Sequence, residues 1–370
     1  MSSNNVLGII FSNAYDELLP EMTTFRTMGS VPFAGRYRLI DFPLSNMVNA
    51  GISQVGIITK ANYRSLMDHV GNGKAWDLSR KREGMTILPP FNTTETGMSV
   101  GKLDALCGSI DYLSSSDKEY VLLTDCNVLG NIDYEDMINA HIEKNADITL
   151  AYTRGIPKQI NYATEYEFGA DGKIVSSKFI GNFTLETNYS TNVMVIRRSL
   201  LERLLQEAHS SRVENLESLI AMHLVHLKAY GYEQKGYIRV LSSLQDYYNV
   251  SLELLDRDNM KQIFAPDKPI YTKTRDEVPA FYGISSNVKN SLIADGCRIE
   301  GEVENCILFR GVTVAKGAKI KNSIIMQGSF VGENASIECV ILDKSVAIKP
   351  GKNLCGASNF PVYVGKEIVI

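Results

Sequence analysis

The last third of the sequence repeats one unit three times without a gap. Residues 304–320, 321–337 and 338–354 are equal in length, and each has isoleucine at its fourth position. Leu or Ile stands at the fifth position, Val or Ile at the eleventh and Ile or Leu at the last, and a looser copy precedes them at 289–303. Units this short bury a core only by stacking. The repeat therefore predicts a hexapeptide-type β-solenoid with three short faces per turn. A β-sandwich is the alternative, but its copies would show weaker register.

The sequence before the repeats alternates short apolar runs with longer helical patterns. Continuous apolar runs of this length are typical of strands covered on both faces, and their alternation with helices predicts a mostly parallel sheet. We therefore expect a Rossmann-like α/β domain whose ligand crevice lies at the carboxyl ends of the strands. The expected strands are 6–11, 55–59, 120–124, 147–152 and 192–196, and the expected helical stretches are 43–51, 61–70, 101–113, 134–145 and 199–229.

A proline-containing segment separates the two patterns. Residues 264–281 have three prolines, mixed charge and few periodic apolar positions, which is typical of a linker. A chain of 370 residues is also long enough for two domains. We expect an α/β domain over residues 1–262, a linker over 263–284 and the solenoid over 285–370.

Charge and cysteine usage exclude several classes of protein. The net charge of -4 gives no positive field that would attract nucleic acid or an acidic membrane. The six cysteines form no C-x-x-C pair, which favours reduced thiols, and no apolar run has the length of a signal peptide core or a membrane span. We expect a cytoplasmic protein that binds neither nucleic acid nor membrane.

Several long motifs resemble those of the bacterial ADP-glucose pyrophosphorylase (glucose-1-phosphate adenylyltransferase) family. They are "VPFAGRYRLIDFPLSNMVNAGI" (31–52), "GNGKAWDLSRKREGMTILPP" (71–90), "NIDYEDMINAHIEKNADIT" (131–149) and "SLELL" (251–255). The resemblance covers essentially the whole chain. It implies a nucleotidyltransferase domain that joins glucose-1-phosphate to the α-phosphate of ATP, followed by a left-handed parallel β-helix that supports assembly and regulation. Members of the family are tetramers that make the glucosyl donor for glycogen.

The groups that this reaction needs are replaced here. A triphosphate is held by backbone N–H groups of a glycine-rich turn, by basic side chains and by Mg²⁺ on carboxylates. By the resemblance, the family's glycine loop falls on residues 12–18, which have no glycine and carry Asp16 and Glu17. The replaced positions are Asn13 in that loop, Met28 for a lysine, Asn127 and Val240 for the two metal aspartates, and Ile180 in the sugar-phosphate motif.

Losses of this kind imply a catalytically inactive chain. Removal of one charge-stabilising donor costs roughly a hundred- to a thousand-fold in rate, and such losses are not simply additive. The resemblance is closest to a degenerate regulatory subunit of the family, which implies a non-catalytic role in a hetero-tetramer with a catalytic subunit and no cofactor. Two alternatives remain: a weakly active enzyme whose Mg²⁺ is held by Asp125 and Asp104, and an effector-binding homo-oligomer without a catalytic partner.

The resemblance also implies an anionic effector site between the domains. Its candidate residues are Arg26, Arg36, Arg38 and Arg310, and the alternative for Arg38 is a structural pairing with Asp41. Trp76 and Ser190 are candidates for the remains of the nucleotide and sugar pocket, with core packing as the alternative for Trp76. No metal site is expected, because His223 and His226 have no cysteine or carboxylate at suitable spacing. No histidine follows residue 226, so a solenoid acetyltransferase is not expected.

Overall fold

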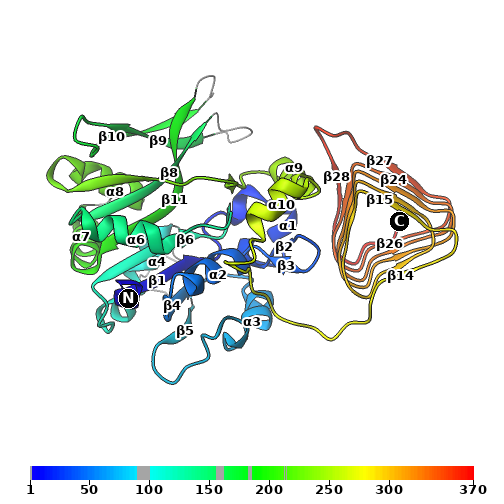
Figure 1. Cartoon of the computed structure of the whole chain (residues 1–370), viewed down its shortest axis with the longest axis horizontal. Coiled ribbons are helices and arrows are strands. Elements are labelled where there is room, and N and C mark those ends of the chain that lie inside the picture. Colours follow the sequence, from blue (N-terminus) through cyan, green and yellow to red (C-terminus); the bar gives the residue numbers. More distant parts are fainter. Residues whose placement is uncertain (1, 90–100, 156–161, 182–185, 212, 214) are drawn as a thin grey trace.

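The structure, a computed structural model, has an α/β domain and a three-sided β-helix side by side (Figure 1). It describes residues 2–89, 101–155, 162–181, 186–211, 213 and 215–370. Residues 264–280, all of them described, form neither helix nor strand and run from the first domain to the second. None of the helices in the described part of the chain is long and apolar enough to cross a lipid bilayer.

The α/β domain is built on a nine-stranded sheet with the order β10-β9-β11-β6-β1-β4-β5, while β8 pairs with β11 and β12. The strands are β1 (Val6–Phe11), β4 (Gln54–Ile58), β5 (Gly84–Leu88), β6 (Tyr120–Asp125), β8 (Ile148–Gly155), β9 (Tyr162–Phe168), β10 (Ile174–Gly181), β11 (Thr187–Arg197) and β12 (Ala229–Glu233). Only β11 and β10 run opposite to the other strands of this sheet. The expected Rossmann-like domain with a mostly parallel sheet is confirmed.

Helices cover both faces of this sheet because its central strands are apolar on both sides. Val6 and Ile10 of β1 belong to one core cluster together with residues of α2, α6 and α9, whereas Leu7 and Ile9 belong to a second cluster with α4, α5, α7 and α8. The helices are α1 (Pro20–Thr23), α2 (Asp41–Asn49), α3 (Arg64–Val70), α4 (Lys102–Cys107), α5 (Ile110–Ser114), α6 (Tyr134–Glu143), α7 (Arg198–Ser211), α8 (Leu216–His223), α9 (Leu244–Glu253) and α10 (Arg257–Ile263).

The helical stretch expected over 199–229 is interrupted in the structure. Helices α7 and α8 lie within it, and the side chain of Asn215 starts α8 by accepting a hydrogen bond from the backbone N–H of Ser218. A 3₁₀ turn, η5 (Leu224–His226), follows, and Ala229 already belongs to β12. The i, i+4 spacing of the leucines therefore predicts the helices but not the breaks between them.

Three parallel sheets of five strands each form the β-helix, and their triangular outline is visible in Figure 1. The first sheet contains β14 (Phe281–Tyr282), β17 (Arg298–Ile299), β20 (Thr313–Val314), β23 (Phe330–Val331) and β26 (Ala347–Ile348). The second contains β15 (Asn287–Lys289), β18 (Glu302–Glu304), β21 (Lys319–Lys321), β24 (Ser336–Glu338) and β27 (Asn353–Cys355). The third contains β16 (Leu292–Ile293), β19 (Ile307–Leu308), β22 (Ile324–Ile325), β25 (Val340–Leu342) and β28 (Val362–Val364). Equivalent positions of the sequence repeats are stacked in register, as Ile307, Ile324 and Ile341 illustrate.

Neighbouring apolar positions of the repeat face opposite ways, as successive residues of a strand must. The fifth positions (Leu308, Ile325, Leu342) belong to the core inside the β-helix. The fourth positions (Ile307, Ile324, Ile341) are fully buried in the core cluster of the α/β domain instead. The third sheet of the β-helix is therefore the surface that docks on the α/β domain, and its last strand, β28, lies beside α9 in Figure 1.

A short hairpin of the α/β domain packs against this third sheet. Strands β2 (Pro32–Phe33) and β3 (Tyr37–Arg38) belong to the "VPFAGRYRLIDF" motif and are joined by a tight turn. Gly35 in this turn has φ +79°, and a Cβ there would lie 3.4 Å from Leu292 on β16. The turn thus needs a residue that tolerates positive φ and lies close to the solenoid.

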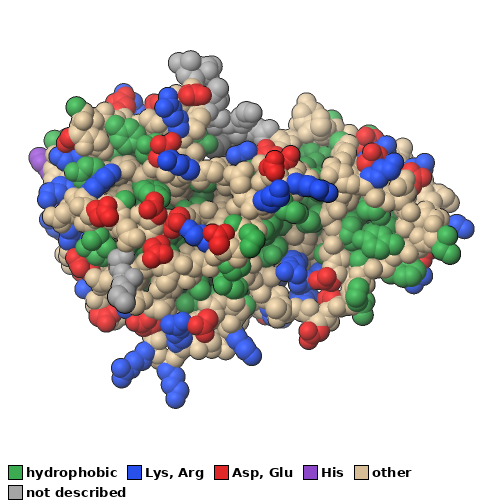
Figure 2. Space-filling view, in the orientation of Figure 1, with side chains coloured by type: hydrophobic (Ala, Val, Ile, Leu, Met, Phe, Trp, Pro, Cys, Tyr) green, Lys and Arg blue, Asp and Glu red, His purple; other side chains and the backbone are tan. Residues whose placement is uncertain are grey.

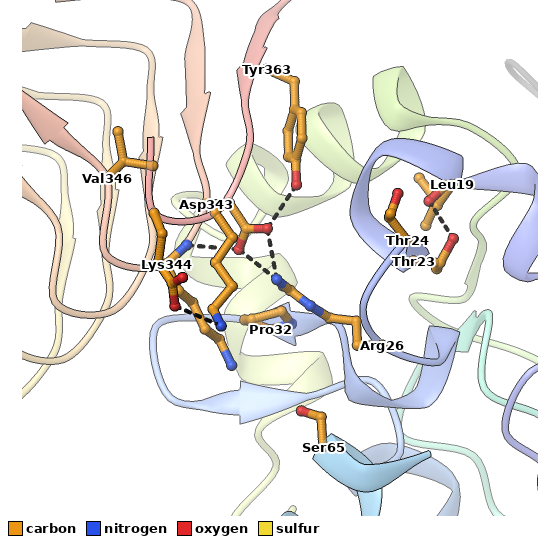
Figure 3. Close-up of polar contacts among 12 residues, drawn as sticks. Leu19, Thr23, Thr24, Arg26, Pro32, Ser65, Asp343, Lys344, Val346 and Tyr363 are labelled. Atoms are coloured by element: carbon orange, nitrogen blue, oxygen red, sulfur yellow. Dashed lines mark hydrogen bonds and ion pairs between the residues drawn. The ribbon is translucent and has the colours of Figure 1, made fainter. Parts of the chain in front are cut away.

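A buried ion pair also joins the two domains (Figure 3). Nη2 of Arg26 lies 2.9 and 2.7 Å from the two carboxylate oxygens of Asp343, and the hydroxyl of Tyr363 donates to the same carboxylate over 2.7 Å. The side chains of Arg26 and Asp343 are only 4% and 2% exposed. Separation of the domains would break this ion pair. On the outer surface, by contrast, Figure 2 shows basic and acidic side chains interspersed.

Substitution of Asp343 by Asn tests this joint. We expect D343N to lower the free energy of unfolding by about 3–5 kcal/mol, because the Arg26 guanidinium stays buried without a counter-charge. Denaturation in urea measures the loss. E302Q, which removes the exposed Lys319–Glu302 ion pair of the solenoid, is the matched control and should change the stability by less than about 1 kcal/mol. Equal effects of the two substitutions would contradict the interpretation.

Candidate functional site

A cavity of about 800 Å³ opens beyond the carboxyl ends of β1 and β6. Ala14 and Tyr15 follow β1 and line one side of it, and Asn127 follows β6 and lines another. Ligands of open α/β sheets bind at this edge, where strand order changes direction. The cavity therefore lies where the sequence predicts the ligand crevice.

The structure brings some of the sequence-predicted residues to this cavity and leaves others out. Asn127, Val240 and Ser190 line it. Ile180 does not, although its neighbour Phe179 does. The remaining predicted pocket residues, Asn13, Met28 and Trp76, are buried and do not belong to the lining.

Trp76 is a core residue, so the structure bears out core packing, its alternative, and not the pocket role. It is 1% exposed, its indole N–H donates to the hydroxyl of Ser45 over 3.3 Å, and its ring meets the ring of His69 edge-on. A tryptophan that is fully packed and hydrogen-bonded inside the fold has no face left for a ligand.

The polar groups of Asp16, in the loop after β1, form hydrogen bonds with neighbouring residues of the protein. Oδ1 of Asp16 accepts a hydrogen bond from the backbone N–H of Met28 over 2.7 Å, and Oγ1 of Thr23 donates to the backbone carbonyl of Asp16. Burial raises the pKa of Asp16 to about 7. Asp16 thus holds the loop closed, whereas Glu17 is exposed.

A lysine that the sequence analysis did not single out is the central charge of the cavity. Nζ of Lys102 lies 2.7 Å from Oδ2 of Asp125 and 3.2 Å from Oε1 of Glu217, and it lies over the ring of Tyr15. Burial alone would lower the pKa of Lys102, but these carboxylates raise it well above its ordinary value. Burial raises the pKa of Asp125 to about 6 in spite of the lysine. Lys102 is therefore a permanent cation at this position.

The residues around Asp125 do not fit a bound Mg²⁺ ion. One oxygen of Asp125 already contacts the Lys102 ammonium, Asn127 offers only a neutral amide oxygen, and Val240 offers no ligand atom. Mg²⁺ requires oxygen ligands in near-octahedral geometry, usually from carboxylates and water. Within the described ranges, no group of three or more His, Cys, Asp or Glu side chains is arranged to hold a metal ion.

The four candidate effector arginines lie at the junction between the domains in two groups. In the first, Arg26 pairs with Asp343 and Arg38 lies next to Lys344, which is mostly buried. Burial and, to a smaller extent, the positive charges of Arg38 and Arg26 lower the pKa of Lys344 to about 7. The side chain of Arg38 donates to the carbonyl and hydroxyl of Ser65, and only its backbone N–H donates to Asp41. A salt bridge between Arg38 and Asp41 is therefore not the structural role of this arginine.

In the second group, Arg36 and Arg310 line a cavity of about 250 Å³ together with Arg275 and Asp295. Arg310 is 7% exposed, its Nε lies 4.0 Å from the carboxylate of Asp295, and that Nε makes no hydrogen bond within the described structure. Burial lowers the pKa of Arg310, and the nearby Arg36 contributes to the shift. Arg275 also influences the pKa of Lys344, so the two groups form one positive region.

The sequence analysis did not identify Lys102, Glu217 or Lys344, because the role of each depends on side chains that are distant in the sequence. Lys102 begins α4 directly after Gly101, and Glu217 lies in the first turn of α8, more than a hundred residues away. Nothing in the local pattern marks either residue. Lys344 follows Asp343 in an ordinary repeat unit and differs from exposed solenoid lysines only by its burial.

Comparisons with known proteins place these features in a family. The sequence matches the family described as Nucleotidyl transferase over residues 17–169 and the family described as GlmU-like, C-terminal hexapeptide over residues 280–358. The latter match is consistent with the expected left-handed β-helix. The chain is 37% identical to the glycogen biosynthesis protein GlgD of Bacillus subtilis (strain 168), over 100% of this chain and 98% of that protein.

Two further relatives are a second glycogen biosynthesis protein and a glucose-1-phosphate adenylyltransferase. The chain is 39% identical to the glycogen biosynthesis protein GlgD of Geobacillus stearothermophilus, over 86% of this chain and 83% of that protein. It is 32% identical to the glucose-1-phosphate adenylyltransferase of Fervidobacterium nodosum, over 94% of this chain and 85% of that protein.

Replacement of Lys102 by Met tests whether it is the counter-ion of Asp125. In K102M the buried Asp125 should keep its proton in the folded state to a pH well above the ordinary value near 3.8. The folded state then binds more protons than the unfolded state, so the stability of K102M should fall as pH rises from about 4 to 8. Urea midpoints at several pH values measure this slope. The double variant K102M/D125N should lose it, and an unchanged slope in the double variant would contradict the assignment.

Proposed function

The chain belongs to the glucose-1-phosphate adenylyltransferase (ADP-glucose pyrophosphorylase) family of glycogen synthesis, and on that premise we propose that it is a non-catalytic regulatory subunit of the ADP-glucose-forming enzyme. The observation that carries the proposal is the Lys102 ammonium held by Asp125 and Glu217 in the cavity of the α/β domain. A fixed lysine there neutralises the carboxylates that a catalytic metal ion would need.

The geometry of the loop after β1 supports the same proposal. Catalysis of nucleotidyl transfer depends on positioning the phosphates and on stabilising their developing charge. Here Asp16 occupies the backbone N–H of Met28, and the buried Met28 side chain cannot neutralise a leaving pyrophosphate. Each such loss costs roughly a hundred- to a thousand-fold in rate.

The first alternative is a weakly active enzyme that holds Mg²⁺ with Asp125 and Asp104. Asp104 is exposed on α4 and does not belong to the cavity lining, whereas Asp125 is fully buried against Lys102. This arrangement favours the regulatory role. The second alternative, an effector-binding homo-oligomer without a catalytic partner, differs in its behaviour toward a catalytic subunit.

The proposed partner is a catalytic ADP-glucose pyrophosphorylase subunit in a cytoplasmic hetero-tetramer, and the proposed effector is an anionic metabolite. The positive region between the domains supports the effector. Arg310 is buried and its Nε makes no hydrogen bond within the described structure, and Lys344 is half-buried near Arg26 and Arg38. An anion bound there would contact both domains and could couple its binding to the orientation of the solenoid.

The activity of the purified chain tests the proposal. With ATP, glucose-1-phosphate and Mg²⁺, we expect pyrophosphate release to stay far below about 1 s⁻¹, the lower end of the ordinary enzyme range. Addition of a catalytic subunit should give a mixture whose effector affinity differs from that of the catalytic subunit alone by roughly 5- to 150-fold, or about 1–3 kcal/mol. Pyrophosphate release by the chain alone at about 1 s⁻¹ or faster would contradict the proposal. So would a mixture whose effector affinity equals that of a control mixture containing the heat-unfolded chain.

Proton uptake tests the effector region separately. Because burial and neighbouring arginines lower the pKa of Lys344 to about 7, much of this lysine is neutral at pH 7.5. A bound anion favours the charged form, so sulfate binding at pH 7.5 should be accompanied by proton uptake. Calorimetry in buffers of different ionisation enthalpy measures the uptake. It should vanish in K344Q, while the exposed control K319Q should behave as the wild type; sulfate binding without proton uptake would contradict the assignment.

A further inference from the structure

The charges around Lys344 at the domain junction are mostly positive. The charged groups with the largest effect on its ammonium are Arg38, Arg26, Asp343 and Arg275. Three of these are guanidinium groups and one is a carboxylate. Such a group is stabilised by a further negative charge, because each guanidinium attracts an anion placed beside it. Lys344 can supply that charge itself by a covalent change.

We propose that Lys344 is a site of reversible carbamylation by dissolved carbon dioxide. The carbamate is an anion that is fixed to the solenoid and bound by arginines of the α/β domain. The inference deepens the effector region proposed above, because it names a covalent ligand of the same positive charges. It rests on that proposal only for its regulatory meaning. The chemistry depends on a neutral amine and on guanidinium groups that have N–H donors free for an anion.

The reaction needs no reagent other than carbon dioxide. The lone pair of the neutral Lys344 amine attacks the carbon atom, so that an N–C bond forms. One C–O π bond breaks and leaves its electron pair on oxygen, and the nitrogen releases one proton to the solvent. The neutral amine thus becomes a carbamate with one negative charge, and no atom is oxidised or reduced. Return of the proton and loss of carbon dioxide reverse the step.

The surroundings of Lys344 favour the neutral amine. Its side chain is half-buried and makes no ion pair within the described ranges of the chain. The carboxylate of Asp343 is bound by Arg26 and by the hydroxyl of Tyr363. Burial and, to a smaller extent, the positive charges of Arg38 and Arg26 lower the pKa of Lys344 to about 7. A desolvated lysine beside other cations is a typical nucleophile, because much of it is neutral near physiological pH.

Two arginines of the α/β domain have N–H groups available for the carbamate. Figure 3 shows Arg26 and Lys344 both beside Asp343. Nη2 of Arg26 binds Asp343, whereas its Nη1 is buried and makes no hydrogen bond within the described structure. The guanidinium of Arg38 is also buried, and it binds Ser65 through Nη1. A buried N–H without an acceptor is costly, and a planar, carboxylate-like anion is the partner that a guanidinium matches best.

The other acids near Arg38 do not supply this anion. Asp41 is fully buried, and its two carboxylate oxygens are bound by the ring of His69 and by the backbone N–H of Arg38. Asp68 acts on the pKa of Arg38 more weakly than Asp41 does, and it is exposed to solvent. An anion formed on Lys344 therefore meets guanidinium groups that these acids leave incompletely neutralised.

Incubation of the full chain with carbon-13-labelled bicarbonate and carbon dioxide tests the inference. At about pH 7.5 we expect a carbamate resonance in the carbon-13 NMR spectrum that saturates with an apparent Kd for carbon dioxide of about 1 mM or tighter. The ammonium form has no lone pair, so the resonance should weaken at least about fivefold when the pH is lowered from about 7.5 to about 6. Trapping of the carbamate by ethylation, followed by peptide mass spectrometry, should locate it on Lys344.

K344R is the test variant, because arginine keeps the positive charge but stays protonated and cannot react. It should lose the carbamate resonance, while K319R, at an exposed lysine of the solenoid, should retain it. Absence of the resonance in the wild type, an equal resonance in K344R or equal trapping on Lys319 would each show that Lys344 is not the carbamylated residue. The label is measured on the chain alone, so a failure of the proposed function, seen as pyrophosphate release or as an unchanged effector affinity of the mixture, is a separate result.

Discussion

The docking of one solenoid face on the α/β domain is the interaction on which the rest of the structure depends. A column of stacked residues on the third sheet of the β-helix, Leu292, Ile307, Ile324, Ile341 and Tyr363, faces the α/β core. Burial of each large apolar side chain stabilises the contact by about 1.5–3 kcal/mol relative to exposure. Because this face excludes water, an ion pair and a group of basic side chains can be held between the domains.

The "VPFAGRYRLIDF" motif and the loop after β1 differ in what they contact. The "VPFAGRYRLIDF" segment forms the β2–β3 hairpin and packs on the solenoid, so its residues serve the domain junction whether or not the chain is an enzyme. The loop over residues 12–18 has no glycine, and Asp16 binds it to the backbone N–H of Met28. The domain contact therefore does not depend on the chemistry of the cavity, in keeping with the separation of fold from function.

Prediction from sequence succeeded where the signal is local and periodic. Strand β1 was predicted with its observed bounds, the repeat predicted three parallel sheets, and the family motifs led to the nucleotidyltransferase domain. It failed where a residue acquires its role from a distant partner. Lys102 was overlooked because Asp125 and Glu217 reach it from two other elements, and only the fold decided between the pocket and the core for Trp76, which is packed in the core.

The sequence by itself determined the two-domain plan, the solenoid and the absence of the glycine loop, because periodicity and residue type suffice for these features. Only the tertiary structure decided which isoleucine of each repeat faces the solenoid core and which faces the other domain, since both are equally apolar in the sequence. It alone also decided the electrostatics of the cavity and of the domain junction. The charge state of Asp125 or Lys344 depends on burial and on neighbours brought together by folding, and neither is written in the local sequence.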